Sequence, residues 1–484
     1  MLFNSAIFLL FFTLFILLYW LVFNKIVKVQ NIFLLLASYF FYAWWDVKFL
    51  LLLITSSLAY FYLGIYISKT ENTKWQKSLL YIGIFQGIGL LLFFKYYNFF
   101  ILPLLGLFHS LNVNFNFHSL NIILPLGISF YTFKGIGYLV DIYNDKIKPT
   151  NDPVIFLTYL SFFPTLLSGP IDSAHSFIPQ LEKKRAFDFS QSLDGSMQIL
   201  WGFFKKLVVA DNCAAITNYL FDNYPTLPAS SLLLASFLYT IQLYADFSGY
   251  SDMAIGFSRL LGFNVTKNFN FPFYAQNIAD FWQRWHISLT SWMTEYVFTP
   301  LSFTFRRTGK IGVVFAILIN FILVGFWHGP NWTYILYGFL HGCYFIPLVM
   351  QDRMAKVKLK DRLFPTSIEL VKMLGTFSLV MFSLLIFKAS SLSQAFSYFS
   401  HIISFTVFEI PLVFNIQSTL VVIFFCIIVL LVEWFQRHKD HALQFFPITN
   451  KYHFYSRSLL LSFLFWAIIL WGASGNKTFM YFQF

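Results

Sequence analysis

Residues 311–350 read IGVVFAILINFILVGFWHGPNWTYILYGFLHGCYFIPLVM, which is two long apolar runs joined by Gly-Pro-Asn at 329–331. Each run has about 20 residues, the length of an α-helix that crosses a lipid bilayer. Because glycine and proline end helices, we predict that one helix stops near His328 and that a second begins near Trp332. A buried imidazole at membrane depth needs a partner, a cavity or a chemical role. The stretch therefore predicts a helical hairpin with a polar group at its turn.

Apolar runs of this kind recur along the whole chain of 484 residues, which is 58% hydrophobic and only 11% charged. A soluble globular protein has roughly 25% charged residues. We predict an all-α polytopic membrane protein with a single integral-membrane domain, residues 1–484, and about ten to twelve spans plus re-entrant or interfacial helices. Residues 160–170, which contain two prolines and a glycine, are the best re-entrant candidate. The apolar runs lie near residues 5–23, 31–45, 48–67, 78–94, 122–140, 154–170, 195–210, 229–260, 311–328, 332–350, 367–388, 394–413, 417–435 and 456–473.

The net charge of +12 comes from short basic clusters, at 182–185, 306–310 and 353–362 among others. In a membrane protein this pattern marks cytoplasmic loops, so it indicates the lipid bilayer as a partner and no nucleic acid. Only two apolar runs separate the last two clusters, so the turn after His328 should face away from the cytoplasm. We read the first run as a retained helix and not as a signal peptide.

A second dense stretch, Asp280-Phe-Trp-Gln-Arg-Trp-His-Ile-Ser288, lies about 40 residues before His328. On a continuous helix over 280–296, Arg284 and Ser288 share one stripe and Trp285 lies on the adjacent one. This pattern favours a helix that lines a cavity or lies at an interface. An amphipathic surface helix, with His286 as a hydrogen-bonded structural residue, is the alternative.

His328 is the best candidate for a catalytic group, although a lone buried histidine is more often simply packed. Glycines at 325 and 329 would let a substrate approach the ring closely. The sequence has no HExxH, Gly-x-Ser-x-Gly, Walker or Rossmann pattern, no metal-ligand cluster, and three scattered cysteines. The chemistry that these absences leave open is a histidine acting as a general base on a hydroxyl group. Acyl transfer from a thioester to a hydroxyl group is a reaction that such a histidine can catalyse.

Two carboxylates, Asp246 and Asp252, lie inside the apolar run 229–260. Buried carboxylates need partners, and Lys205, Lys206 or Arg284 are available. We favour structural ion pairs here over direct catalysis.

Seven segments carry a resemblance, and they occur in order along the chain: Ala43–Asp46, Ile123–Phe130, Ser168–Ile171, Tyr244–Asp252, Asp280–Trp292, Gly325–Trp332 and Phe479–Phe484. They resemble the membrane-bound O-acyltransferase (MBOAT) family, in its bacterial alginate O-acetyltransferase-like branch. The resemblance implies an MBOAT fold of helices around a central tunnel, with His328 as the main catalytic histidine and His286 as the second functional position. It also implies that an acetyl group from acetyl-CoA, or another cytoplasmic thioester, crosses the membrane to an extracytoplasmic SGNH-type acetyltransferase partner that modifies a polysaccharide.

The C-terminal Phe479–Phe484 is also similar to the end of a small partner protein of teichoic-acid D-alanylation, which suggests that Tyr481 carries the acyl group transiently as an ester. We expect a bacterial inner-membrane enzyme that binds no cofactor or metal. The acceptor polymer, an alginate-like exopolysaccharide or peptidoglycan among others, stays open, as do two alternatives: D-alanyl transfer to teichoic acid, and an ion or solute transporter. The residues expected in or around the tunnel are Asp246, Asp252, Arg284, Trp285, Ser288, Trp327, Asn331, Trp332 and His341.

Overall fold

The computed structural model of the chain describes residues 1–111, 120–354, 357, 362–444, 451–473 and 479–480. All the regular structure in these residues is helical, with no strand, so the all-α prediction is confirmed. The helices form two compact units. Unit 1 comprises Met1–Phe189 and Leu261–Thr266, and unit 2 comprises Ser190–Leu260 and Lys267–Phe484. The prediction of one integral-membrane domain over residues 1–484 stays a prediction.

Seven helices in the described residues are long and apolar enough to cross a membrane, which confirms a multi-pass protein. The other predicted spans form helices that are shorter or more polar. The prediction of a span at 394–413 is wrong, because α19 covers only Leu392–Ile402 and non-helical chain and a short 3-10 turn follow it. The seven are Val47–Lys69, Thr73–Gly106, Lys310–His328, Trp332–Met350, Ser367–Lys388, Ile416–Phe435 and Phe454–Trp471.

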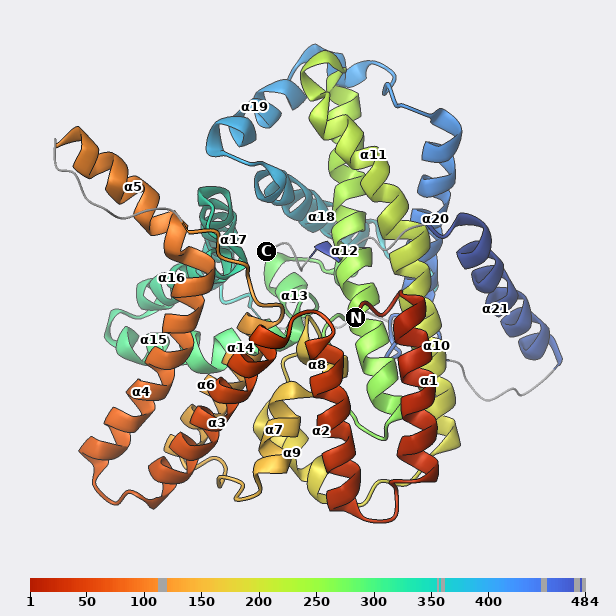
Figure 1. Cartoon of the computed structure of the whole chain (residues 1–484). Coiled ribbons are helices and arrows are strands. Elements are labelled where there is room, and N and C mark those ends of the chain that lie inside the picture. The colour runs from red at the N-terminus through yellow and green to blue at the C-terminus, as the bar shows by residue number, and fades with distance from the viewer. Residues whose placement is uncertain (112–119, 355–356, 358–361, 445–450, 474–478, 481–484) are drawn as a thin grey trace. The chain divides into compact units, whose positions relative to one another are not determined.

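In unit 1, α3, α4 and α6 pack on one another (Figure 1). The helical structure is interrupted at the predicted re-entrant segment, where α7 ends at Ser161 and the short α8 begins at Phe163. Residues 160–170 are all buried, so protein surrounds the interrupted backbone, as a break at membrane depth requires. The helices of unit 1 are α1 (Ala6–Leu21), α2 (Val27–Ala43), α3 (Val47–Lys69), α4 (Thr73–Leu91), η1 (Leu92–Tyr96), α5 (Tyr97–Ser110), α6 (Ile128–Tyr143), α7 (Pro153–Ser161), α8 (Phe163–Leu166) and α9 (Ala174–Glu182).

Unit 2 is organised around α12, a helix of 32 residues whose side chains are mostly buried (Figure 1). The segments η2 and α11 run along it, and α10 crosses it at close-packed glycines. A Cβ on Gly202 would lie 2.6 Å from the carbonyl oxygen of Gly249, so only glycine permits this close crossing. The first helices of unit 2 are α10 (Phe189–Phe203), the π-helix η2 (Phe204–Ala210), α11 (Asp211–Asp222), η3 (Tyr224–Thr226), α12 (Ala229–Leu260), η4 (Pro272–Tyr274), α13 (Ile278–Trp282) and α14 (Ile287–Met293).

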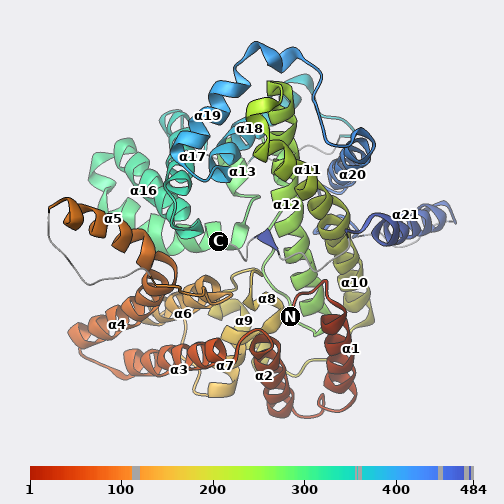
Figure 2. The ribbon, with the colours of Figure 1, turned by 45° about the horizontal axis from the view of Figure 1, so that its top comes forward.

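The predicted hairpin is confirmed as α16 (Lys310–His328) and α17 (Trp332–Met350), which lie side by side in Figures 1 and 2. Gly325 and Gly338 meet where the two helices cross, and a Cβ on either would collide with the backbone of the other helix. Gly325 therefore serves helix packing and not the approach of a substrate, which corrects our prediction. The remaining helices are η5 (Thr294–Phe298), α15 (Thr299–Thr304), η6 (Arg306–Thr308), α18 (Ser367–Lys388), η7 (Phe405–Phe408), α20 (Ile416–Phe435) and α21 (Lys451–Trp471).

Candidate active site

His328 is the last residue of α16, and its side chain is buried. Its ring centroid lies 5.1 Å from that of Phe387, edge to face, and 6.2 Å from that of Tyr337. Gly329 is the C-cap that follows, and Asn331 caps α17 by accepting a hydrogen bond from the N–H of Thr333 at 3.0 Å. The broken helix thus places an imidazole among aromatic rings at a helix terminus.

His286 lies between α13 and α14 in a left-handed backbone conformation, with φ +47°. Its Nδ1 lies 3.1 Å from Oδ1 of Asn268, an oxygen that also accepts from the Ser288 hydroxyl at 3.0 Å. Because an amide oxygen can only accept, Nδ1 is the donor, and Nε2 of the neutral ring is the nitrogen able to take up a proton. Burial lowers the pKa of His286 to about 3, so the ring is neutral near pH 7.

Trp327 links the two predicted catalytic histidines. The indole centroid is 5.8 Å from that of His286 and 5.0 Å from that of His328. The structure therefore brings together residues that are 42 positions apart in the sequence. Trp332, by contrast, is 61% exposed at the start of α17.

His341, on α17, is held by a hydrogen bond from a tryptophan and not, like His286, by an asparagine. Its Nδ1 accepts a hydrogen bond from Nε1 of Trp282 at 3.1 Å, and its ring lies 4.4 Å from that of Tyr337. In the neutral imidazole the hydrogen is then on Nε2, which makes that nitrogen a donor and not a base. Nε2 is buried, and no residue in the described part of the chain forms a hydrogen bond with it. His341 is therefore suited to donate a hydrogen bond.

The prediction of one continuous helix over 280–296 is wrong. The chain forms α13, turns at His286, and continues as α14 and the π-helix η5. Backbone hydrogen bonds with an earlier segment of the chain stabilise this turn. The carbonyl oxygen of Asn268 accepts from the N–H of Ile287 at 2.8 Å, and the N–H of Asn270 donates to the carbonyl oxygen of Arg284 at 2.9 Å. The predicted stripe of side chains does not exist, although Trp285 and Ser288 are both buried.

Arg284 pairs with Asp280, one turn earlier, at 2.8 Å. It also donates to the carbonyl oxygens of Asn270 at 3.4 Å and Val357 at 3.2 Å. Asp280 and Arg284 are both buried, so this pair satisfies its own charges. Our suggestion that Arg284 partners Asp246 or Asp252 is therefore wrong.

Asp246 and Asp252 pair instead with the two lysines of η2, as we also predicted. Lys206 Nζ is 2.6 Å from Oδ1 of Asp246, and Lys205 Nζ is 2.6 Å from Oδ2 of Asp252. Lys206 also contacts Asp211 at 2.9 Å. We call these five residues, together with Glu433, the ion cluster; Glu433 lies 3.8 Å from Lys205 and accepts from the Tyr244 hydroxyl at 2.8 Å. The close crossing at Gly202 and Gly249 brings the lysines and the carboxylates within reach of each other.

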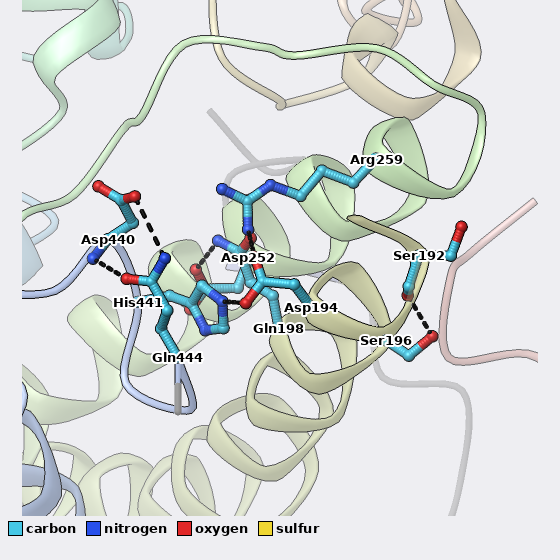
Figure 3. A network of polar contacts seen from close by, with 9 residues as sticks. All are labelled: Ser192, Asp194, Ser196, Gln198, Asp252, Arg259, Asp440, His441 and Gln444. Carbon is cyan, nitrogen blue, oxygen red and sulfur yellow. Dashed lines mark hydrogen bonds and ion pairs between the residues drawn. The ribbon is translucent and has the colours of Figure 1, made fainter. Parts of the chain in front are cut away.

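A more exposed polar network lies at the other end of the α10–α12 crossing (Figure 3). Asp194 on α10 accepts from Arg259 on α12 and from Nε2 of His441 at 2.9 Å. Burial raises the pKa of the Asp194 carboxyl, but the hydrogen bond from His441 and the charges of His441 and Arg259 outweigh it and hold the pKa below its usual value. Gln198 connects this region to the ion cluster by donating to Asp252 at 2.9 Å.

Tyr481 lies outside the described residues, but the two residues before it do not. Phe479 is buried, with its ring 4.8 Å from that of Tyr250, and the N–H of Met480 donates to Oδ2 of Asp246 at 2.8 Å. The described part of the C-terminal segment, Phe479 and Met480, therefore reaches the ion cluster.

Sequence reasoning missed Asn268, Glu433 and Tyr337. Glu433 was detectable, because it is the only acidic residue in the predicted span 417–435. Asn268 and Tyr337 gave no signal, since one is an ordinary polar residue in a connection and the other is one of 27 tyrosines. No group of three metal-ligating side chains occurs in the part of the chain that the structure describes.

These features define an all-helical, multi-pass membrane protein with buried histidines grouped around one tryptophan. Residues 40–364 match the membrane-bound O-acyltransferase family. The chain belongs to this family and is an O-acyltransferase.

Named relatives support the same assignment. The chain is 35% identical to a probable alginate O-acetylase of Azotobacter vinelandii, over 84% of this chain and 78% of that protein. It is 34% identical to a peptidoglycan O-acetyltransferase of Helicobacter pylori, over 75% of this chain and 72% of that protein. It is also 34% identical to a teichoic acid D-alanyltransferase of Bacillus subtilis, over 46% of this chain and 58% of that protein.

Proposed function

We propose that the chain is the membrane subunit of a polysaccharide O-acetyltransferase. It moves an acetyl group from a cytoplasmic thioester, acetyl-CoA, across the membrane for O-acetylation of an extracytoplasmic polysaccharide. The observation that carries the proposal is the grouping of His286 and His328 around Trp327, in a chain similar over most of its length to an alginate O-acetylase.

His328 is the general base in this proposal. Its imidazole takes the proton of the attacking hydroxyl, while the hydroxyl oxygen bonds to the thioester carbonyl carbon. The carbon–sulfur bond then breaks, and the leaving thiolate takes the proton from the imidazolium. The aromatic walls of Phe387 and Tyr337 exclude water from this step, and exclusion of water protects a thioester from hydrolysis.

His286 and His341 have supporting roles that follow from their tautomers. His286 presents Nε2 as an acceptor, so it can orient a hydroxyl group, while Asn268 fixes its ring. His341 presents an Nε2–H donor, which suits the oxygen that becomes negative in the transition state. Removal of one such donor typically costs about 100-fold or more in rate.

The basic loops support entry of the donor from the cytoplasmic side. Arg306 and Arg307 are exposed, and Lys310 is half-exposed next to Asp352 at 2.6 Å. Exposed guanidinium groups can meet the phosphates of a thioester donor or those of anionic lipid headgroups. Binding of acetyl-CoA to protein in vesicles of neutral lipid, compared with vesicles that contain anionic lipid, separates these two sources.

The acyl group leaves through a relay in this proposal. Tyr481 accepts it as an ester and passes it to an extracytoplasmic SGNH-type acetyltransferase partner. The position of Phe479 and Met480 against α12 supports this relay, because it brings the two residues directly before Tyr481 to the interior of unit 2.

D-alanyl transfer to teichoic acid is the second candidate, and the similarity to a teichoic acid D-alanyltransferase favours it. The match covers less than half of this chain, whereas the match to the alginate O-acetylase covers 84%. Acetylation of an exopolysaccharide or of peptidoglycan is therefore our choice. The transporter alternative loses its support, because the chain belongs to an acyltransferase family and its buried carboxylates are paired with lysines.

Acetyl content of the polymer tests the proposal. In cells that express the full chain and its partner, His328→Ala should lower polymer acetylation by at least about 100-fold. Tyr481→Phe should abolish it while the protein still inserts in the membrane. His175→Ala, which changes an exposed histidine of unit 1, is the matched control. Normal acetylation in His328→Ala overturns the catalytic role, and normal acetylation in Tyr481→Phe overturns the relay. D-alanyl esters in place of acetyl esters would favour the second candidate.

A further inference from the structure

The C-terminal segment makes specific contacts with one carboxylate of the ion cluster. The backbone N–H of Met480 donates to Oδ2 of Asp246 at 2.8 Å. Nε2 of Gln242, one turn earlier on α12, lies 3.2 Å from Sδ of Met480. The ring of Phe479 is buried and meets that of Tyr250 edge to face, with centroids 4.8 Å apart. The segment is therefore held at its backbone and at two side chains.

Lys206 supports the same contact from the other side. Its Nζ is 2.6 Å from Oδ1 of Asp246 and 4.3 Å from the centroid of the Phe479 ring. A cation over a ring is attracted by the negative face of that ring. The two oxygens of Asp246 therefore have separate tasks, since Oδ1 receives the lysine and Oδ2 receives the C-terminal segment.

Asp252 provides the comparison within the same helix. Its Oδ2 is 2.6 Å from Lys205, and its Oδ1 accepts from Gln198 at 2.9 Å. Both of its oxygens are used by residues of α10 and η2. In the part of the chain that the structure describes, Asp252 forms no hydrogen bond with Phe479 or Met480. Two adjacent lysines and two carboxylates on one helix thus serve different purposes.

We propose that the Asp246–Lys206 pair is an anchoring site for the C-terminal segment and that both are positioning residues for the acyl relay. The anchor fixes the backbone at Met480. Because consecutive Cα atoms are about 3.8 Å apart, fixing Met480 restricts where the next residue can go. The consequence for catalysis rests on the proposed function, whereas the anchoring itself does not.

Amide hydrogen exchange of the full-length protein in lipid nanodiscs tests the anchor directly. A hydrogen bond to a charged acceptor changes an equilibrium by about 10- to 100-fold. We expect Asp246→Asn to speed exchange at the Met480 amide by about 10-fold or more, because the neutral amide oxygen is a weaker acceptor and loses its lysine. Asp252→Asn is the matched control, since it removes the same charge from the same helix. In Asp252→Asn the Met480 amide should be as well protected from exchange as in the parent protein.

The anchor is overturned if the Met480 amide is equally protected from exchange in Asp246→Asn and in the parent protein. It is also overturned if Asp246→Asn and Asp252→Asn lose that protection equally. A second pair of variants leaves the ion cluster untouched in case Asp246→Asn does not fold. Met480→Pro removes the N–H donor, and Met480→Ala keeps it. We expect the remaining tail amides to exchange faster in Met480→Pro than in Met480→Ala, and equal exchange overturns the anchor.

Acetylation measurements separate the anchor from the relay. If Tyr481→Phe retains polymer acetylation, the relay is wrong, but a loss of tail protection in Asp246→Asn still supports the anchor. If Tyr481→Phe abolishes acetylation while Asp246→Asn keeps the tail protected, the relay stands and the anchor is overturned. If both hold, Met480→Pro should lose a larger share of acetylation than Met480→Ala.

Discussion

The histidine group, which is His286, His328 and His341, and the ion cluster are two buried polar regions of unit 2 that are stabilised in different ways. The ion cluster contains two lysines and four carboxylates, and each lysine lies within 3.0 Å of a carboxylate oxygen. The histidine group is made of imidazoles surrounded by aromatic rings, with hydrogen bonds to an asparagine and a tryptophan. One region pairs buried lysines with buried carboxylates, and the other is built from imidazoles and aromatic rings.

The difference indicates which region is suited to chemistry. A paired lysine or carboxylate cannot take part in proton transfer without leaving its partner buried and charged, which is costly. A neutral imidazole can take up and release a proton with a smaller change in its surroundings. We infer that the histidine group carries out the reaction, while the ion cluster holds helices and the C-terminal segment in place.

Lys206→Met should have the largest effect on stability. It leaves Asp246 and Asp211 buried with no lysine beside them, and the loss of one partner of a buried pair costs about 3–5 kcal/mol. Urea unfolding of the purified protein in detergent measures this. His328→Ala, which removes an imidazole packed among aromatic rings, should lose activity and little stability. A stable Lys206→Met protein would contradict the structural role of the ion cluster.

The second largest effect is expected from acidification, which should lower the free energy of unfolding because His286 is buried as a neutral ring. Its pKa is about 3 in the folded chain and about 6.5 when unfolded, so below pH 6.5 the unfolded chain binds a proton that the folded chain does not. This stability is fully present above pH 6.5 and is lost as the pH falls from there toward 3. Between pH 7 and pH 5 the loss is about 2 kcal/mol.

His286→Gln is the control for this pH effect, because glutamine does not titrate. Thermal unfolding at pH 7 and pH 5 should show a drop for the parent that exceeds the drop for the variant by about 2 kcal/mol. Equal drops would mean that His286 takes up its proton in the folded protein, and the contrast between the two regions would weaken.

The sequence predicted the elements that depend on local patterns. The runs 311–328 and 332–350 match α16 and α17 within one residue, because length, apolarity and the Gly-Pro-Asn break act locally. The turn at His286 was missed because it depends on backbone hydrogen bonds with Asn268 and Asn270, which lie 19 residues before Ile287 and 14 residues before Arg284. Nothing in the local pattern of 280–296 signals a left-handed histidine.

The partners of charged residues show the same limit. Lys205 and Lys206 were correctly proposed for the carboxylates of α12, but the sequence could not choose between them and Arg284. The choice follows from the close crossing of α10 with α12, which only the folded structure reveals. The fate of Gly325, which packs against Gly338 rather than facing a substrate, depends likewise on how two helices cross.

Trp282→Phe should have a smaller effect, confined to the histidine group. It removes the N–H that donates to Nδ1 of His341 and leaves a buried acceptor, at a cost of about 1–2 kcal/mol. Because phenylalanine is also smaller, a double-mutant cycle with His341→Phe isolates the hydrogen bond. A coupling energy near zero would show that the bond does not fix the His341 tautomer.

Asp194→Asn should have the smallest effect, because this carboxylate is 30% exposed and solvent screens its pairs. Such pairs contribute up to about 1 kcal/mol. The pKa of Asp194 is lowered in the folded chain, so its stabilisation is present above the unfolded value of about 3.9 and is lost as the pH falls through the folded one. Unfolding at pH 7 and at pH 3 should therefore show a small deficit for Asp194→Asn that shrinks in acid. A deficit at pH 7 as large as that of Lys206→Met would mean that exposure does not separate this network from the ion cluster, and burial would no longer explain why one region stabilises the fold more than the other.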